Sequence, residues 1–194
     1  MEKLVAIVLM AGLSTRFGGP KNKQLCLLNN KSIFSYSIDT FAAYKSVNQL
    51  LVVVNKDNKN EIENYINKNH LNVTLVLGGI TRQESVENAL KILTLDDNDI
   101  VMIHDGARPL IDNKIIEDVK SAAEMSGAST SYLEATDTIA IKDEDDLISS
   151  FQNRSKVALI QTPQAFKYGL LKEAHKVENI NATDDCTLVF NFAT

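Results

Sequence analysis

Short runs rich in apolar residues alternate along the chain with longer segments in which apolar positions recur every three or four residues. Such short runs are typical of strands that are buried on both faces of a sheet. Five of them lie at residues 4–10, 49–54, 73–77, 100–104 and 128–133. The alternation predicts βαβ units, and therefore an α/β fold with a mostly parallel central sheet and helices on both faces.

The longer segments lie at residues 32–44, 58–67, 82–93 and 113–126. Their ends carry capping signals that support helices. Thr81 followed by Glu84 has the spacing of a capping box, and Asp57 and Asp112 stand where N-cap residues are expected. Gly127 follows the fourth segment, where a left-handed C-cap favours glycine.

The pattern changes beyond Glu134, where a protruding β-arm is expected. Residues 136–141 predict a strand, residues 142–146 a charged turn and residues 147–151 a returning strand. A two-stranded hairpin is only marginally stable alone in water, so we expect this arm, at about residues 136–155, to pack on a second copy of the chain in a homodimer. A strand at 157–161 and helices at 168–176 and 184–192 complete the single domain predicted for residues 1–194.

Composition narrows the class of protein. The chain has 194 residues, of which 44% are apolar and 23% charged, which excludes disordered, collagen-like and coiled-coil proteins and fits one globular domain. Lys and Arg number 20 against 25 Asp and Glu, a net charge of −5. The positive field that non-specific nucleic-acid binding needs is therefore missing, and we expect a small ligand and no nucleic-acid partner.

Cysteine spacing and hydropathy bear on the compartment. Cys26 and Cys186 are far apart without a C-x-x-C pattern, so neither a disulfide framework nor a zinc site is expected. The early apolar run at residues 4–10 is much shorter than the ~18 residues of a membrane span. A signal peptide is the alternative interpretation of this run, but the polar residues that follow at once favour a strand leading into a loop. We expect a cytoplasmic protein with reduced thiols and no membrane partner.

Residues 10–24, directly after the first predicted strand, hold the first candidate site. Ligands of open α/β sheets bind beyond the carboxyl ends of strands. Ala11 and Gly12 allow the backbone to approach a ligand closely, and Arg16 and Lys23 supply positive charge for a triphosphate. The spacing fits neither the G-x-G-x-x-G dinucleotide fingerprint nor a P-loop. The alternative is a flexible glycine loop without a ligand.

Asp105 ends another predicted strand, within the segment Ile103-His104-Asp105-Gly106-Ala107-Arg108-Pro109. A single hard carboxylate beside small residues leaves coordination positions open for water and phosphate oxygens, as Mg²⁺ prefers. Asp105 is therefore the candidate metal ligand. The alternative is a turn in which Asp105 pairs with Arg108, and His104 is interpreted as structural.

Two further segments are weaker when taken alone. The turn from Gly78 to Ser85 offers backbone groups, hydroxyls and a helix N-terminus to a base or ribose, but it is equally a capped helix start. The pair Asp137 and Thr138, and the cluster of Arg154 with Gln-Thr-Pro-Gln at residues 161–164, are as compatible with an ordinary surface.

Together, in their order, these motifs resemble those of the 2-C-methyl-D-erythritol 4-phosphate cytidylyltransferase family. The motifs are Ala-Gly-x3-Arg-x-Gly, Lys-Gln, Gly-Gly-x2-Arg-x2-Ser, His-Asp-x-Ala-Arg-Pro, Asp-Thr, Gln-Thr-Pro-Gln-x-Phe and Thr-Asp-Asp. They run from residue 4 to about residue 189. The resemblance implies a Rossmann-like nucleotidyltransferase that transfers CMP from CTP to a sugar-alcohol phosphate with Mg²⁺ and releases pyrophosphate.

The resemblance also assigns roles to residues. Arg16 and Lys23 would be catalytic and stabilise the pentavalent phosphorus and the leaving pyrophosphate, and Asp105 would bind the metal. The nucleotide would be bound by Ala11, Gly12, Gly79, Arg82 and Ser85, and the second substrate by Asp137, Thr138, Arg154 and Thr162, with the arm completing the site of the neighbouring subunit. By the same resemblance the acceptor's own phosphate would be the nucleophile, so no general base would be needed.

Departures from the family pattern leave alternatives open. Lys21 and Lys23 both follow Pro20, and Lys23 is favoured as the catalytic lysine because Gln24 and Leu25 follow it. Family members continue past the Thr-Asp-Asp segment through a lysine that contacts substrate phosphate, so the family's C-terminal tail is expected to be missing here. A nucleotide-binding protein without turnover is therefore an alternative.

A second alternative concerns the acceptor. The ribitol-5-phosphate (pentitol-phosphate) cytidylyltransferases of teichoic acid synthesis share most of these motifs, and residues 134–139 resemble that branch. Residues 82–86 and 183–185 resemble the methylerythritol branch more, which we favour. A redox protein that binds a dinucleotide is the remaining rival.

Overall fold

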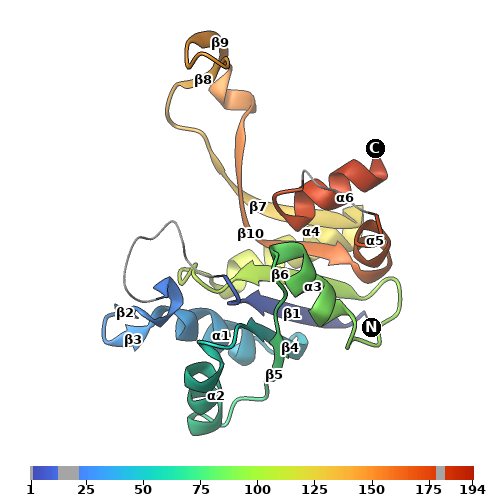
Figure 1. Ribbon diagram of the computed structural model, residues 1–194. Helices are drawn as coiled ribbons and strands as arrows, with labels where there is room; N and C mark the ends of the chain where they lie inside the picture. Colours follow the sequence, from blue (N-terminus) through green and yellow to red (C-terminus); the bar gives the residue numbers. More distant parts are fainter. Residues whose placement is uncertain (1, 13–21, 178–181) are drawn as a thin grey trace.

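A central sheet organises the computed structural model, which describes residues 2–12, 22–177 and 182–194 (Figure 1). Within these residues the sheet has six strands in the order β5-β4-β1-β6-β10-β7. They are β1 (Leu4–Leu9), β4 (Val47–Val54), β5 (Thr74–Leu77), β6 (Ile100–Asp105), β7 (Ala128–Glu134) and β10 (Ala158–Lys167). Strands β5, β4, β1 and β6 are parallel, and β10 is antiparallel to both of its neighbours. The predicted mostly parallel sheet is confirmed.

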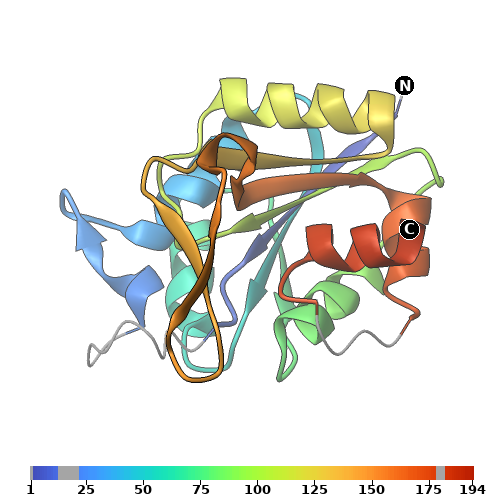
Figure 2. The ribbon, with the colours of Figure 1, turned by 90° about the horizontal axis from the view of Figure 1, so that it is seen from above.

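Helices cover both faces of this sheet, as Figure 2 shows from above. Alternate side chains of β1 point to opposite faces and join two separate cores. One core packs α1 (Ile33–Ala43), α2 (Lys59–Lys68) and α4 (Asn113–Ser126) on the sheet, and the other packs α3 (Arg82–Leu90), α5 (Tyr168–Ala174) and α6 (Asp185–Ala193). Because burying one large apolar side chain stabilises a fold by about 1.5–3 kcal/mol, these two cores fix the sheet between its helical layers.

The helix ends test the capping predictions. Thr81 and Glu84 form the reciprocal capping box of α3, the Asp112 side chain accepts from the Ile115 N–H at 2.8 Å, and Gly127 ends α4 with a φ of +89°. The prediction for Asp57 is wrong. Helix α2 begins after Asn58, and the Asn55 side chain is the group that accepts the N–H groups of Asp57 and Asn58, at 3.0 and 2.9 Å.

Strand β10 makes the sheet differ from the prediction at one side. It continues well beyond the predicted residues 157–161 and lies between β6 and β7, so β7 becomes an edge strand whose residues are half-buried or exposed. The expectation that residues 128–133 are buried on both faces is therefore wrong. The register of β10 with β7 shifts between Ile160 and Gln164, around Pro163, which has no N–H to donate to a neighbouring strand.

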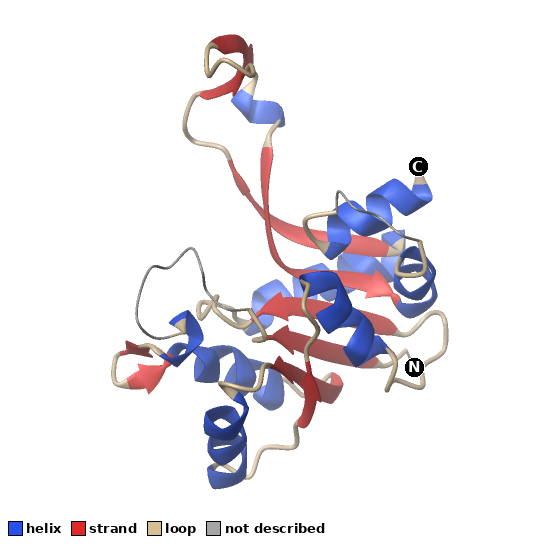
Figure 3. Cartoon of the chain, in the orientation of Figure 1, coloured by secondary structure: helices blue, strands red, loops and turns tan. Residues whose placement is uncertain are grey.

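The arm leaves the sheet where β7 ends and returns through β10 (Figures 1 and 3). Strands β8 (Ile139–Lys142) and β9 (Ile148–Gln152) pair antiparallel at its tip, followed by the 3-10 helix η3 (Arg154–Lys156). Leu147, Ile148 and Phe151 are 63–67% exposed there. The predicted protruding arm is present and carries apolar side chains to its surface.

Three small elements complete the description. The 3-10 helix η2 (Lys23–Leu25) precedes a two-stranded hairpin of β2 (Leu27–Leu28) and β3 (Lys31–Ser32), which the sequence pattern did not predict.

In the described ranges, none of the helices combines the length and the apolar character that crossing a bilayer requires.

Candidate active site

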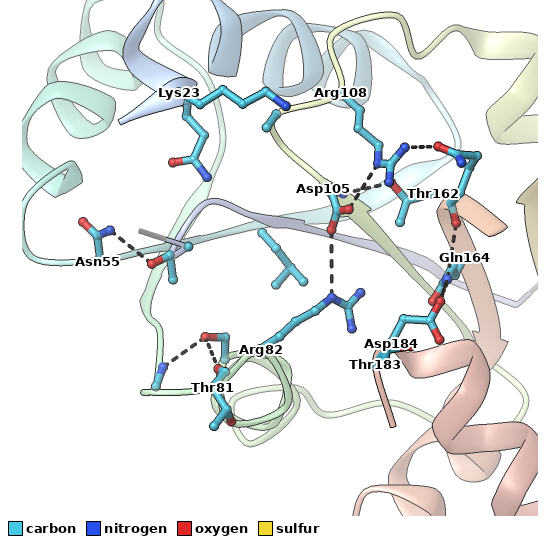
Figure 4. Close-up of a pocket in the computed structure, with 18 of the residues that line it drawn as sticks. Lys23, Asn55, Thr81, Arg82, Asp105, Arg108, Thr162, Gln164, Thr183 and Asp184 are labelled. Atoms are coloured by element: carbon cyan, nitrogen blue, oxygen red, sulfur yellow. Dashed lines mark hydrogen bonds and ion pairs between the residues drawn. The ribbon is translucent and has the colours of Figure 1, made fainter. Parts of the chain in front are cut away.

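A cleft of about 1,100 Å³ opens where β1, β4 and β6 end (Figure 4). In a parallel sheet these carboxyl ends lie at one edge, which is where α/β proteins bind ligands. Most of the residues singled out from the sequence line it, namely Ala11, Gly12, Lys23, Gly79, Arg82, Ser85, Asp105, Arg108 and Thr162. Segments separated by up to about 150 positions thus meet in one place.

One wall is formed by two glycine-containing segments in close contact. A Cβ atom on Gly78 would collide with the Ala11 side chain and would lie 2.8 Å from the Ser85 Oγ. Only glycine therefore lets the turn after β5 approach the segment after β1. Ser85 is buried, and its hydroxyl accepts from the Gly79 N–H at 3.1 Å and donates to the Thr81 carbonyl at 2.9 Å. The Ser85 hydroxyl thus shapes the turn from within.

Asp105 lies at the floor of the cleft with two guanidinium groups beside it. Its side chain is 36% exposed, with one oxygen 3.2 Å from the Arg108 Nε and the other 3.9 Å from the Arg82 Nε. Arg108 also donates to the Gln161 side chain on β10. The alternative read from the sequence, an Asp105–Arg108 pair, is present, and it leaves the carboxylate facing the cleft.

Arg82 is held in place by a buried partner. Its Nη1 lies 2.5 Å from the Asp185 Oδ2, and Asp185, 1% exposed, also contacts the His175 Nε2 at 3.0 Å. Burial lowers the pKa of Arg82, but the carboxylates of Asp185 and Asp105 outweigh burial and raise the pKa above its ordinary value. The Arg82 guanidinium therefore stays charged at the edge of the cleft.

A chain of hydrogen bonds anchors Asp105 from behind. The Asp105 N–H donates to the Thr162 hydroxyl at 3.1 Å, and that hydroxyl lies 3.2 Å from the His104 Nδ1. The His104 Nε2 lies 3.1 Å from the Arg108 carbonyl, which can only accept, so Nε2 carries a proton. Burial lowers the pKa of His104 to about 4, so the ring is neutral near pH 7. This agrees with the interpretation of His104 as structural.

Several predicted residues are not brought to the cleft. Asp137, Thr138 and Arg154 belong to the arm, where they are exposed, and the Arg154 Nη1 donates to the Thr136 carbonyl at 2.7 Å. Arg16 and Lys21 lie outside the described residues. The choice between Lys21 and Lys23 therefore rests on sequence, although Lys23 does line the cleft.

Comparison with known proteins identifies the family. The model of the 2-C-methyl-D-erythritol 4-phosphate cytidylyltransferase family matches residues 4–193. The chain belongs to this cytidylyltransferase family. The resemblance read from the motifs is thereby confirmed.

Relatives and solved structures agree with that assignment. The chain is 39% identical to the 2-C-methyl-D-erythritol 4-phosphate cytidylyltransferase of Clostridium novyi (strain NT), over 99% of this chain and 85% of that protein. It is also 39% identical to the enzyme of that name from Clostridium acetobutylicum, over 97% and 83%. The crystal structure of 4-diphosphocytidyl-2C-methyl-D-erythritol synthase from Anaerococcus prevotii superposes with a TM-score of 0.85 at 26% identity, covering 99% of this chain and 83% of that one.

The cleft of this cytidylyltransferase offers few protein ligands for a divalent cation. In the described part of the chain, no group of three or more His, Cys, Asp or Glu side chains is placed to hold a metal. Mg²⁺ in nucleotide enzymes is commonly held by one or two carboxylates together with phosphate oxygens and water. Asp105 is a partly exposed carboxylate at the floor of the cleft, so the residues present fit such a site.

Sequence reasoning missed Asn55, a polar residue that lines the cleft, and it gave Gln24, Gln161, Gln164 and Asp184 only as members of motifs, without a role of their own. Gln164 is 1% exposed and donates to the Asp184 carboxylate at 2.8 Å. Burial raises the pKa of Asp184, but hydrogen bonds from the Thr187 N–H and the Gln164 amide outweigh burial and lower it. Asn55 had a signal that was not used, because a polar residue directly after a buried strand lies at the ligand-binding edge.

Proposed function

We propose that this protein transfers CMP from CTP to 2-C-methyl-D-erythritol 4-phosphate and releases pyrophosphate, a step of isoprenoid precursor synthesis. The observation that carries the proposal is the cleft itself. It places Asp105 between Arg82 and Arg108, with Lys23 and two close-packed glycine segments also lining it, in a member of the cytidylyltransferase family. Within the described ranges, the three cations that line the cleft outnumber its two carboxylates, Asp105 and Asp184, which suits a polyanionic ligand although the chain as a whole carries a net charge of −5.

No side chain of the protein has to form a covalent bond with the substrate in this reaction. An oxygen of the acceptor's phosphate attacks the α-phosphorus of CTP, a new P–O bond forms, and the bond from the α-phosphorus to the bridging oxygen breaks to release pyrophosphate. The attacking oxygen is already ionised near neutral pH, so no base has to remove a proton. Positioning and charge neutralisation dominate such transfers, and we assign these tasks to Lys23 and to Arg16 of the first loop.

A divalent cation, which we propose is Mg²⁺, would be held by Asp105 with phosphate oxygens of CTP. When bound, it neutralises charge that develops on the phosphates. Arg82 and Arg108 stand on both sides of Asp105 and keep the carboxylate in a fixed position. Lys23 also lines the cleft, across from Arg82 in Figure 4, so triphosphate oxygens would meet positive charge on more than one side.

The nucleoside would lie against the two glycine segments. Ala11, Gly12, Gly79 and Ser85 line a part of the cleft that is narrowed where Gly78 packs closely against the Ala11 side chain. Backbone hydrogen bonds matched to cytosine, together with this narrowness, would exclude purines. Arg82, at the start of α3, lies next to this part and is proposed to contact the nucleotide.

The acceptor would be bound between two subunits. Thr162 lines the cleft of its own chain, whereas Asp137, Thr138 and Arg154 project on the arm, away from that cleft. A homodimer in which the arm of one subunit reaches the cleft of the other would bring both sets together. The exposed apolar side chains of the arm support this arrangement, since they gain by burial against a partner.

The compartment follows from the substrate and the thiols. CTP is an intracellular nucleotide, and both cysteines, Cys26 and Cys186, are unpaired. We therefore propose a cytoplasmic enzyme.

Pyrophosphate release tests the proposal directly. The chain is incubated with CTP and Mg²⁺, with methylerythritol 4-phosphate and ribitol 5-phosphate as acceptors in parallel reactions. Release that depends on methylerythritol 4-phosphate is expected. Release with ribitol 5-phosphate alone would assign the protein to the pentitol branch. CTP binding by calorimetry without release in either reaction would support a binding protein and refute the proposed activity.

A further inference from the structure

Three consecutive peptide carbonyls at the start of the first loop are each held by the side-chain amide of an asparagine. The acceptors are the carbonyl oxygens of Met10, Ala11 and Gly12, and the donors are the Nδ2 groups of Asn58, Asn55 and Asn22, at 2.7, 3.1 and 3.3 Å respectively. Figure 4 shows the bond from Asn55 at the edge of the cleft. The asparagines come from two separate segments, the turn between β4 and α2 and the residue before η2.

Asn55 and Asn58 lock each other in place. The Asn55 N–H donates to the Asn58 Oδ1 at 3.0 Å, and the Asn58 N–H donates to the Asn55 Oδ1 at 2.9 Å. Since both Oδ1 atoms accept backbone N–H groups, the two NH₂ groups must face the loop carbonyls. Asn58 is fully buried and also donates to the Gln24 Oε1 at 3.4 Å, which links the pair to the segment that carries Lys23.

Because the peptide group is planar, these contacts also fix the direction of the backbone N–H groups of Ala11 and Gly12. In a planar trans peptide the C=O of one residue and the N–H of the next point in opposite directions. Holding the carbonyls of Met10 and Ala11 toward the asparagines therefore directs the N–H groups of Ala11 and Gly12 the other way. Among the described residues, no acceptor pairs with either N–H group, and both residues line the cleft.

We propose that Asn55 and Asn58 are positioning residues that aim the Ala11 and Gly12 N–H groups at acceptor oxygens of the bound nucleotide. This inference rests on the proposed function, because it takes CTP as the ligand. The two side chains act through the backbone, without a role in the chemical step. Their loss should therefore weaken CTP binding in the ground state and the transition state alike, raising KM and leaving kcat nearly unchanged.

Two substitutions at the half-buried Asn55 separate the possible causes. Asn55→Asp removes the donor to Ala11 but keeps the oxygen that accepts the N–H groups of Asp57 and Asn58, so α2 still begins normally. Asn55→Ala removes the donor without adding charge, and it also removes the oxygen that accepts the N–H groups of Asp57 and Asn58. We expect each to raise the Kd and the KM for CTP about tenfold, which is about 1.4 kcal/mol of binding free energy, because the Ala11 carbonyl is no longer held and the Gly12 N–H is no longer aimed at the ligand. The KM for the acceptor and kcat should stay within about threefold.

Asn69→Asp is the matched control. Asn69 is exposed on the far end of α2, and its Nδ2 also donates to a backbone carbonyl, that of Tyr65, at 2.8 Å. The same chemical change there should leave CTP binding unaltered. Calorimetry of CTP with Mg²⁺ measures Kd whether or not turnover occurs, so the positioning role of Asn55 and Asn58 is judged separately from the proposed activity. Missing turnover with CTP binding retained would refute the activity alone.

Specific results would overturn the inference. Asn55→Ala binding CTP within about twofold of the wild type would do so, as would a fall in kcat as large as the rise in KM. If Asn55→Ala does not fold, Asn55→Asp is measured at about 0.05 and about 0.5 M salt, because added salt screens charge repulsion but does not replace a lost donor. A rise in the Kd for CTP, relative to the wild type at the same salt concentration, that persists at high salt supports the positioning role of Asn55. A rise that vanishes at high salt refutes it.

Discussion

Asp185→Asn should destabilise the protein far more than the loss of any surface ion pair. Asp185 is 1% exposed and lies 2.5 Å from the Arg82 Nη1 and 3.0 Å from the His175 Nε2. The change keeps the shape of the side chain but leaves the Arg82 guanidinium without its nearest counter-charge. Breaking a fully buried ion pair by removing one partner costs about 3–5 kcal/mol.

Two features of the site reduce that figure. The Arg82 side chain is 29% exposed, so water solvates part of the charge, and the Asp105 carboxylate remains 3.9 Å from the Arg82 Nε. We therefore expect a loss of about 2–3 kcal/mol in the free energy of unfolding. For a domain of this size that corresponds to a fall in Tm of about 4–12 °C.

Urea denaturation at pH 7, followed by circular dichroism, measures this change. Asp118→Asn is the control, because Asp118 pairs with Lys114 on the surface of α4 and its loss should leave the midpoint unchanged. The double variant Arg82→Met with Asp185→Leu should recover most of the stability, since it leaves no unpaired buried charge. A loss below about 0.5 kcal/mol for Asp185→Asn would refute the view that Asp185 is the buried partner that holds Arg82 in place.

Three further predictions concern pH, packing and the acceptor. The pKa of His104 is about 4 in the fold, below the unfolded value of about 6.5, so the unfolded chain binds the extra proton first. The free energy of unfolding should therefore fall as pH drops from about 6.5 to about 4. Urea denaturation across this pH range should show a smaller fall for His104→Gln than for the wild type, and an equal fall would contradict the prediction. Gly78→Ala should cost about 1–3 kcal/mol and raise the KM for CTP, because the new methyl group meets the Ala11 side chain, and normal kinetics would argue against that close approach. Arg154→Ala should raise chiefly the KM for the acceptor, and a change confined to the KM for CTP would exclude its proposed placement.

The sequence by itself determined the elements that depend on neighbours along the chain. Apolar runs such as residues 4–10 predicted the central strands. Successive side chains of a strand point to opposite faces of the sheet, so when both faces are buried every position in the strand must be apolar. The capping box of Thr81 with Glu84 and the left-handed Gly127 were also predicted, since their hydrogen bonds and backbone angles involve only a few consecutive residues. The motif order was enough to indicate the family and the candidate residues of the cleft.

Only the tertiary structure decided how distant segments meet. The insertion of β10 between β6 and β7 depends on pairing between strands, which no local periodicity specifies. The Arg82–Asp185 pair joins residues 103 positions apart, and Asn58 reaches the Met10 carbonyl across 48 positions. Such contacts form because packing of the two cores brings their elements together, so they are consequences of the whole fold and leave no signal in the sequence near either residue.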